Sequence, residues 1–316
     1  QGLTLKEAER CFARACADDN KVDVNDIQTI LDEKRNIIKK TGILEYYPAS
    51  EDMSNVGGMD NLKDWIIKRG SLFTPEAATY GLPEPKGIMM VGISGCGKSL
   101  ISKAIASLWR MPLLRFDIGK VFQKYVGESE ENIRNAIQTA EAIAPSILWI
   151  DEIEKGFSGV SGEGGKDSGV ATRIFGTFLT WMQEKKSSVF VVATANEIRS
   201  LPPELLRKGR FDEIFFIDLP KKEEREIIFK IHLKLRGKSI TDAEISAVSA
   251  KAEGYTGAEI EQVVINGMVE AFYEKRQPNV KDLENALKKT VPLSVTMKEE
   301  IQKLREWASH RTLPAS

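Results

Sequence analysis

The sequence predicts an α/β fold in which a parallel five-stranded sheet lies between layers of helices, followed by a small all-helical lid domain. Three observations support this prediction. Short apolar runs alternate with helical stretches from Val56 onward, a G-x-x-x-x-G-K-[ST] sequence follows the first run, and the apolar runs stop after Pro220. Such alternation is typical of a parallel sheet covered by helices on both faces. We therefore expect a ligand beyond the carboxyl ends of the strands.

The predicted strands are nearly continuously apolar, as strands buried on both faces must be. Together with the helices between them, they form an expected α/β nucleotide-binding domain over residues 48–220. The five predicted strands cover residues 88–91, 113–117, 147–151, 189–194 and 214–219.

Residues 1–47 are predicted to form an N-terminal helical extension. Thr4 and Glu7 have the spacing of a capping box that opens a helix to residue 17, and a second helix is expected over 25–42. Packing against the rest of the chain is the favoured role, with partner binding as the alternative. Because the chain begins at a glutamine, we expect an upstream portion that is missing here.

The residues after Pro220 predict a helical lid domain over 221–290 and a C-terminal helix within 291–316. Helix-start patterns of the S/T-x-x-E type occur where the apolar strands have ended. They begin at Thr241, Thr256 and Thr296, and further helices are expected over 221–235 and 279–289.

The composition is that of an ordinary globular protein. Of 316 residues, 42% are hydrophobic, and 45 basic residues stand against 46 acidic ones, for a formal net charge of −1. This balance provides no basic footprint for nucleic acid, which argues against a DNA-loading or helicase-like protein. Three cysteines and two histidines give neither a disulfide framework nor a zinc-site spacing and fit a reducing compartment. No apolar run approaches the length of a membrane span.

The glycine-rich sequence at 92–99 predicts a phosphate-binding loop, because it lies between a strand and a helix. Its backbone N–H groups and the following helix start would surround an anion. Lys98 would reach the β and γ phosphates of ATP, and Ser99 would hold Mg²⁺. A turn that binds nothing is the alternative, whereas Leu100 occupies the place of the third glycine of a dinucleotide fingerprint. The expected nucleotide-binding residues here are Ser94, Gly95, Cys96, Gly97, Lys98, Ser99 and Leu100.

Two predicted strands end in polar residues suited to hydrolysis. Asp151 and Glu152 follow the run 147–150, and Asn196 follows the run 189–194. We expect Asp151 to hold Mg²⁺, Glu152 to polarise the attacking water, and Asn196 to orient that water. An acidic strand end without function and an asparagine that serves only a turn are the alternatives.

Together with the segment 205–212, these motifs resemble an AAA+ ATPase, and specifically its AAA branch, over residues 56–289. The resemblance implies that Arg207 and Arg210 are arginine fingers that reach the nucleotide of a neighbouring subunit, although two exposed arginines in a turn would look the same. It also implies a homo-oligomeric ring, with a hexamer as the expected assembly. Val56 and Gly57 are assigned by resemblance to the adenine pocket, and Gly257 and Ala258 to the closure of the lid over the nucleotide.

Residues 124–129 resemble the first pore loop of hexameric AAA motors. Lys124, Tyr125 and Val126 would then grip a threaded protein client, although Tyr125 could instead pack against its own domain. The runs 37–45 and 171–184 resemble the AAA ATPase encoded as a hypothetical reading frame in algal plastids and found in cyanobacteria. That subgroup implies an additional N-terminal domain, a cyanobacterial cytoplasm or plastid stroma, and a link to photosynthetic regulation.

The sequence therefore predicts an ATP-driven protein remodeller, with a nucleotide-dependent switch or scaffold of slow turnover as the alternative, because both need the same phosphate chemistry. The client protein is not predicted. Cys96 inside the phosphate loop is interpreted as a tolerated loop residue, with a redox switch as the alternative.

Overall fold

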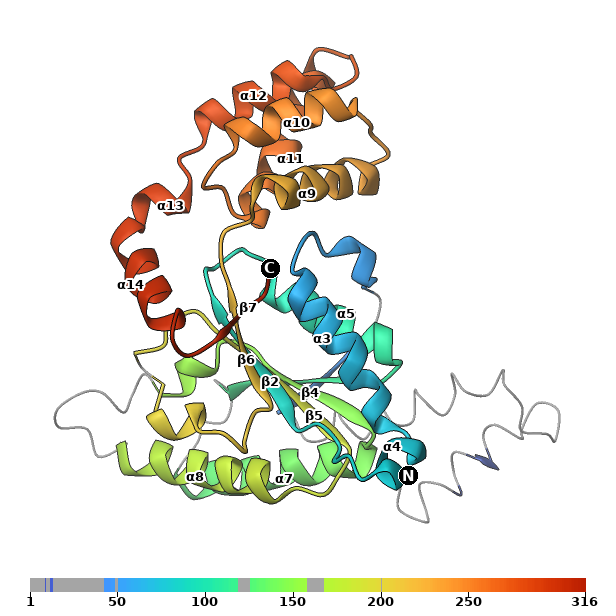
Figure 1. The fold of residues 1–316 in the computed structure, drawn as a ribbon, viewed down its shortest axis with the longest axis vertical. Helices are drawn as coiled ribbons and strands as arrows, with labels where there is room; N and C mark the ends of the chain where they lie inside the picture. Colours follow the sequence, from blue (N-terminus) through green and yellow to red (C-terminus); the bar gives the residue numbers. More distant parts are fainter. Residues whose placement is uncertain are drawn as a thin grey trace.

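The computed structural model describes residues 43–48, 51–118, 126–157, 168–199 and 201–316, and the single positions 9, 12 and 13. A seven-stranded sheet with the order β1-β3-β4-β5-β2-β6-β7 forms the centre of the molecule (Figure 1). Every pair of neighbouring strands is parallel except β1 and β3. The strands are β1 (Leu44–Tyr47), β2 (Gly87–Gly92), β3 (Leu113–Phe116), β4 (Ser146–Ile150), β5 (Val189–Ala195), β6 (Glu213–Ile217) and β7 (Leu313–Pro314).

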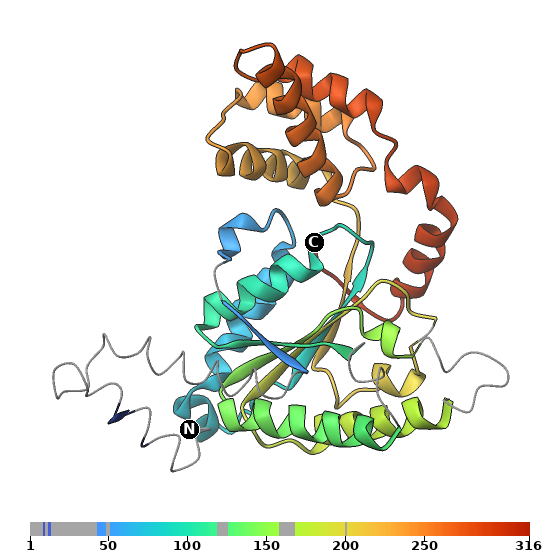
Figure 2. The same ribbon diagram turned by 180° about the vertical axis from the view of Figure 1, so that it is seen from behind.

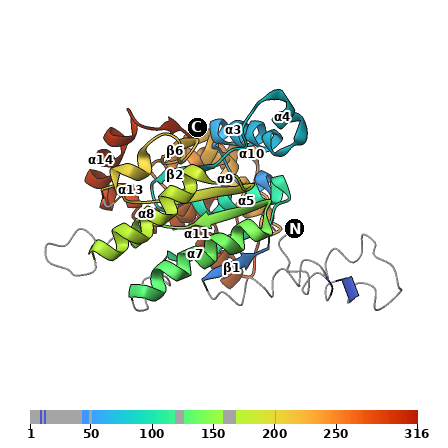
Figure 3. The same ribbon diagram turned by 90° about the horizontal axis from the view of Figure 1, so that it is seen from below.

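Helices cover both faces of the sheet. Met90 on β2 packs in the core that contains α3 and α5, whereas the neighbouring Val91 packs in the core that contains α7 and α8. This alternation explains the continuous apolar runs of the central strands. Figure 3 shows α7 and α8 side by side on one face. The helices and 3₁₀ turns of this part are η2 (Met53–Asn55), α3 (Asp60–Gly70), η3 (Ser71–Phe73), α4 (Pro75–Tyr80), α5 (Lys98–Trp109), α7 (Val126–Ile143), η4 (Ile153–Gly156), α8 (Ser168–Glu184) and η5 (Pro203–Leu206).

The helices after β6 pack around a separate core, which includes the fully buried Phe229 and Leu283. Thr241 and Thr256 form the predicted capping boxes at the starts of α10 and α11. The helices of this lid are α9 (Lys222–Leu235), α10 (Asp242–Lys251), α11 (Gly257–Tyr273) and α12 (Val280–Lys289).

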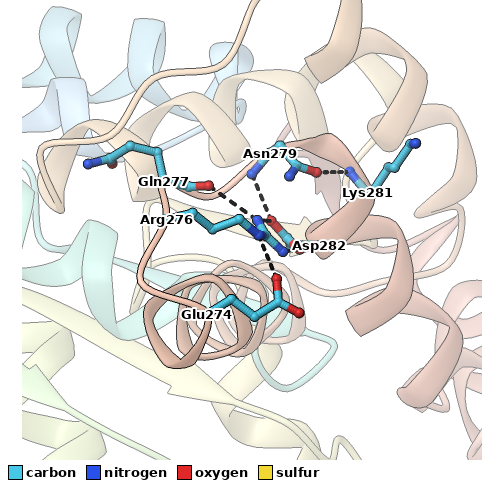
Figure 4. A network of polar contacts seen from close by, with 6 residues as sticks. All are labelled: Glu274, Arg276, Gln277, Asn279, Lys281 and Asp282. Atoms are coloured by element: carbon cyan, nitrogen blue, oxygen red, sulfur yellow. Dashed lines mark hydrogen bonds and ion pairs between the residues drawn. The ribbon is translucent and has the colours of Figure 1, made fainter.

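A polar network joins the end of α11 to the start of α12 (Figure 4). The Arg276 guanidinium donates two hydrogen bonds of 2.6 Å to the two carboxylate oxygens of Asp282, and the Asn279 backbone N–H donates to the same carboxylate at 2.8 Å. Arg276 also pairs with Glu274. Because Asp282 is only 5% exposed, this network fixes the turn between the two helices.

The five predicted strands are all present, within two residues of their predicted bounds, but the sheet has seven strands rather than five. Residues 44–47 were expected within the helical extension and instead form β1, which pairs antiparallel with β3. Tyr47 of β1 contacts the Trp149 ring edge to face, with centroids 5.6 Å apart. The contacts of β1, with β3 and with Trp149 of β4, are thus made with residues far along the chain. Apart from positions 9, 12 and 13, which are helical, the two helices predicted over 4–17 and 25–42 lie outside the described residues.

The C-terminal part differs from the single helix expected there. It contains α13 (Leu293–Thr296), α14 (Lys298–Ala308) and β7. The Thr296 hydroxyl donates to the Leu293 carbonyl at 3.2 Å and so closes α13, while Met297 is the N-cap of α14 and provides no side-chain cap. The prediction that Thr296 opens the final helix is therefore wrong. Figure 2 shows this segment returning from the lid to the sheet. In the described ranges, no helix combines the length and apolar character that a membrane crossing requires.

Candidate active site

A cavity of about 1000 Å³ lies between the lid and the carboxyl ends of the central strands, large enough for a nucleotide-sized ligand. It brings together all the residues that the sequence assigned to nucleotide, metal and water within one subunit. These are Val56, Gly57, Ser94, Gly95, Cys96, Gly97, Lys98, Ser99, Leu100, Asp151, Glu152, Asn196, Gly257 and Ala258.

The loop between β2 and α5 has the conformation of an anion cradle. Gly95 and Gly97 have φ angles of +78° and +89°, a backbone conformation that residues with a Cβ rarely adopt. Gly97 precedes α5 directly, so the positive end of that helix faces the cavity. The buried Lys98 ammonium donates to the carbonyl oxygens of Gly92 at 2.9 Å and Ile93 at 2.8 Å, and burial lowers the pKa of Lys98 to about 8.

The lid touches this loop directly. The Ala258 backbone N–H donates to the Gly95 carbonyl oxygen at 2.9 Å. A Cβ placed on Gly95 would lie 3.1 Å from the Thr256 hydroxyl oxygen, a tight contact that adds to the strain of its positive φ angle. A Cβ on Gly57 would lie 2.5 Å from Ile228 of α9. Gly57 and Ala258 therefore both lie where the lid meets the large domain.

Asp151, Thr194 and Ser99 form a connected group at the edge of the loop. The Ser99 hydroxyl donates to Asp151 Oδ1 at 3.1 Å, and the Thr194 hydroxyl donates to the same oxygen at 2.6 Å. These hard oxygen atoms suit Mg²⁺, which takes one or two protein ligands and completes its octahedron with phosphate oxygens and water. Among the described residues, no group of three His, Cys, Asp or Glu side chains could hold a metal alone. The hydroxyl and carboxylate oxygens of Ser99 and Asp151 fit a Mg²⁺ ion whose other ligands are phosphate oxygens and water.

Glu152 and Asn196 contact each other beside this group. The Asn196 side-chain amide donates to Glu152 Oε1 at 3.2 Å, and Lys155 forms an ion pair with Glu152 Oε2. Glu152 has a φ angle of +52°, which turns its backbone sharply at the end of β4. The Glu152 backbone N–H donates to the Thr194 hydroxyl at 2.9 Å, so contacts of both the backbone and the side chain fix the position of Glu152.

Glu154 lies beneath Asn196. Its Oε1 accepts the Asn196 backbone N–H at 3.0 Å, and its side chain is 92% buried, since the residue is 8% exposed. Burial raises the pKa of Glu154, and the nearby Glu152 adds to this increase. No donor among the described residues reaches Glu154 Oε2.

Cys96 is buried against the loop and does not have the environment of a reactive thiol. Burial raises its pKa to about 12, although Lys98 acts in the opposite direction. Because the thiolate is the reactive form, a neutral buried thiol favours the interpretation of a tolerated loop residue over the redox switch.

Arg207 and Arg210 are not among the described residues that line the cavity. Both follow η5 along the chain and precede β6. Arg207 is exposed, and the Arg210 guanidinium donates to the Glu204 carbonyl. Lys124 and Tyr125 lie outside the described residues, and Val126 is the first residue of α7.

Sequence reasoning missed several residues at the site. Thr194 lies in β5, two residues before Asn196. Glu154 lies in η4, two residues after Glu152, and contacts Asn196 without lining the cavity. This closeness in sequence to predicted catalytic residues was the available signal. The C-terminal residues carried no such signal, because β7 brings them there by pairing with β6. The missed lining residues include Thr194, Glu224, Ile228, Arg305, Ala315 and Ser316.

Comparison with known proteins agrees with this geometry. Residues 88–219 match the family described as ATPase family associated with various cellular activities (AAA), and residues 1–41 match the family described as SpoVK-like AAA ATPase, second domain. The first match begins in β2 and ends just after β6. It thus contains the phosphate loop at 92–99, the acids Asp151 and Glu152, and residues 205–212, which we call the arginine segment.

Several relatives are similar over most of the chain. The uncharacterized AAA domain-containing protein ycf46 of Pyropia yezoensis is 50% identical over 98% of this chain and 62% of the relative, and that of Guillardia theta is 48% identical over 98% and 61%. The cell division cycle protein 48 homolog of Archaeoglobus fulgidus is 33% identical over 79% of this chain and 36% of the relative. The chain spans less than two thirds of the length of these relatives. It belongs to the AAA family of ATPases.

Proposed function

We propose that the chain hydrolyses ATP to ADP and phosphate in the cavity between lid and sheet. The backbone N–H groups of the loop at 94–98 and the Lys98 ammonium bind the phosphates, while Ser99 and Asp151 provide oxygen ligands for Mg²⁺. Bound Mg²⁺ would neutralise charge on the phosphate oxygens. Glu152 accepts a proton from the attacking water, and Asn196 holds that water in line.

The observation that carries this proposal is the pairing of Asn196 with Glu152 at 3.2 Å, beside the loop and beside Asp151. A Glu152→Gln variant keeps the size of the side chain but cannot accept the proton. We expect its turnover to fall by about 10²- to 10⁴-fold, while ATP still binds with nearly the parent affinity. A Glu152→Gln variant that turns over ATP at the parent rate would contradict the assignment.

We further propose that active sites are completed between the subunits of a six-membered ring. Arg207 and Arg210 lie outside the cavity of their own subunit, which supports their action on the nucleotide of a neighbour. A guanidinium stabilises the charge that develops in phosphoryl transfer, and its supply by a neighbour makes hydrolysis depend on assembly. Arg207→Ala should reduce turnover at saturating protein concentration without weakening ATP binding. Unchanged turnover would refute the shared site.

The proposed work of the ring is to remodel or thread a protein client. The similarity to the cell division cycle protein 48 homolog is compatible with this role. In the pore proposal, Tyr125 grips the client with the help of Lys124 and Val126. Tyr125→Ala should keep basal ATPase activity and lose stimulation by the client, and persistent stimulation would argue against threading. Clients captured by Glu152→Gln with ATP would supply the identity of the substrate.

We propose a place in a plastid stroma or a cyanobacterial cytoplasm, which the similarity to proteins of Pyropia yezoensis and Guillardia theta supports. The further proposal of a role in photosynthetic regulation rests on the resemblance in sequence alone.

One observation favours the second candidate, a switch with slow turnover. Lys155 pairs with the Glu152 carboxylate, so an ammonium occupies one of the two oxygens that would accept a proton from the attacking water. In a switch, the Glu152→Gln form with ATP would assemble and already perform the cellular function. In a remodeller, the same form would capture clients but fail to process them.

A further inference from the structure

The arginine segment is bound to the amino end of β2, the strand that carries the phosphate loop at its other end. Asp212 Oδ2 accepts the backbone N–H of Lys86 at 2.6 Å and of Gly87 at 2.9 Å. The Asp212 N–H in turn donates to the Gly87 carbonyl at 2.8 Å. One carboxylate thus fixes the residue at which the arginine segment joins the sheet.

Lys86 provides a second attachment, in the middle of the segment. Its ammonium donates to the Gly209 carbonyl at 2.9 Å and to the Gln183 carbonyl at the end of α8 at 2.6 Å. Gly209 lies between Arg207 and Arg210 and has a φ angle of +98°. The ammonium therefore holds the turn that separates the two arginines and links it to a rigid helix.

Backbone pairing holds β2 and β6 together beyond the contacts of these two side chains. The β2–β6 pairing already extends from Ile88↔Glu213 to Gly92↔Ile217 through backbone hydrogen bonds. Asp212 is exposed to solvent and contributes nothing to the apolar core. Its contacts, and those of Lys86, act on the course of the chain just before β6, where the arginines lie.

The same two side chains are remote from the nucleotide cavity of their own subunit. β2 has six residues and is therefore about 17 Å long. The contacts of Asp212 lie at its amino end, whereas the phosphate loop begins at its carboxyl end. Neither Lys86 nor Asp212 lines the cavity within the described residues.

We propose that Lys86 and Asp212 are positioning residues for the arginine segment, which they hold in the orientation that presents Arg207 and Arg210 to the nucleotide of a second copy of this chain. This inference rests on the proposed shared site. Misplacement of a catalytic group by about 1 Å can cost about 10²-fold in rate. Loss of either attachment should therefore impair hydrolysis in the neighbouring subunit rather than in the subunit that carries the change.

Mixed rings test this inference, with every variant made in the full-length protein. Asp212→Asn removes the charge at constant size, and Lys86→Met removes the ammonium but keeps an apolar stem. Each variant alone should lose about 10- to 100-fold in turnover, with its affinity for ATP unchanged. Asp64→Asn and Lys68→Met alter an exposed ion pair on α3 and serve as matched controls that keep the parent rate.

The decisive measurement mixes each variant with a Lys98→Ala partner, which has lost its own phosphate site but keeps its arginine segment. In a mixed ring, a Lys98→Ala subunit can supply its intact arginine segment to the nucleotide site of an Asp212→Asn neighbour. The ATPase activity of the mixture should then be several-fold higher than the sum of the activities of the two proteins measured separately. Thermal unfolding of each variant shows whether it folds. If Asp212→Asn does not fold, the result for Lys86→Met decides the test.

Parent-like turnover of both variants, or no recovery in the mixtures, would overturn the inference. Arg207→Ala in the same mixtures separates this failure from that of the shared site. If Arg207→Ala recovers while Lys86→Met and Asp212→Asn do not, the arginines act between subunits but are not positioned by these residues. If Arg207→Ala alone is fully active or is not recovered, the shared site itself is wrong.

Discussion

Thr194 donates its hydroxyl hydrogen to Asp151 Oδ1 over 2.6 Å and is almost completely buried, with 1% of its surface exposed. The same hydroxyl accepts the Glu152 backbone N–H over 2.9 Å. One side chain on β5 therefore orients both acids at the end of β4. An uncharged side chain can thus control the geometry of both acids.

We predict that Thr194→Val, which replaces the hydroxyl by a methyl group, reduces turnover by about 10- to 100-fold, as loss of a group that orients a metal ligand does. The Mg²⁺ concentration required for half-maximal activity should rise as well. Steady-state ATPase assays over a Mg²⁺ titration provide the measurement. Thr194→Ser keeps the hydroxyl and should stay close to the parent, and equal losses in both variants would show that only packing matters.

Glu154 gives a prediction for activity. Glu154→Gln keeps an oxygen that can accept the Asn196 N–H, so turnover should remain within about threefold of the parent. Glu154→Leu removes that acceptor, and we expect a loss of about tenfold or more. Similar rates in the two variants would contradict a positioning role for Glu154.

Glu154 also gives a prediction for stability against pH. Its pKa is raised in the folded state by burial, so the protonated form is favoured and its contribution to stability is fully present below the unfolded pKa of about 4.3. That contribution is lost as pH rises through the higher folded pKa. Urea unfolding should therefore show Glu154→Gln gaining stability relative to the parent between pH 5 and pH 8. A constant difference across this range would contradict the prediction.

The network around Asp282 predicts an acid-sensitive contribution to stability. Arg276 lowers the pKa of Asp282, so this contribution is present above the unfolded pKa of about 3.9 and is lost as pH falls through the lower folded value. Asp282→Asn should lower the thermal midpoint at pH 7 by several degrees, and the difference from the parent should shrink below that pH window. Glu270→Gln breaks an exposed ion pair between the same two helices and should change the midpoint little.

For Cys96, we predict equal ATPase rates before and after mild peroxide treatment near pH 7. A thiol with a pKa of about 12 is almost entirely protonated there and reacts slowly. The assay needs a background in which Cys11 and Cys16 are serines, so that Cys96 is the sole cysteine of the 316 residues. Inactivation by peroxide in this background, reversed by a thiol reductant, would restore the redox switch as the better interpretation.

The central strands and the site residues within one subunit could be predicted because their signals are local. Residues 92–99 lie between an apolar strand and a helix, and both acids directly follow such a strand. Parallel strands bring their carboxyl ends to one edge, so Asp151 and Asn196 had to meet near the loop even though their separation along the chain is large.

β1, β7 and the supporting residues could not be predicted in the same way. Leu44–Tyr47 is a strand because β3 offers a free edge, and Leu313–Pro314 because β6 offers another. A proline is compatible with such an edge position. Thr296 has the spacing of a capping box, yet its hydroxyl bonds to the helix before it. In each case the secondary structure depends on a tertiary contact or on local backbone geometry, and the sequence pattern contains no information about either.

The return of the chain through β7 gives the lid two attachments at one place. The lid is entered from the end of β6 and left through α14, whose Arg305 donates to both carboxylate oxygens of Asp218 at 2.8 to 3.0 Å. A lid domain attached at two neighbouring points rotates most easily about the line that joins them. It resists rotation about every other axis. Any rotation of the lid should therefore follow this one axis, and it would break the hydrogen bond from the Ala258 N–H to the Gly95 carbonyl oxygen.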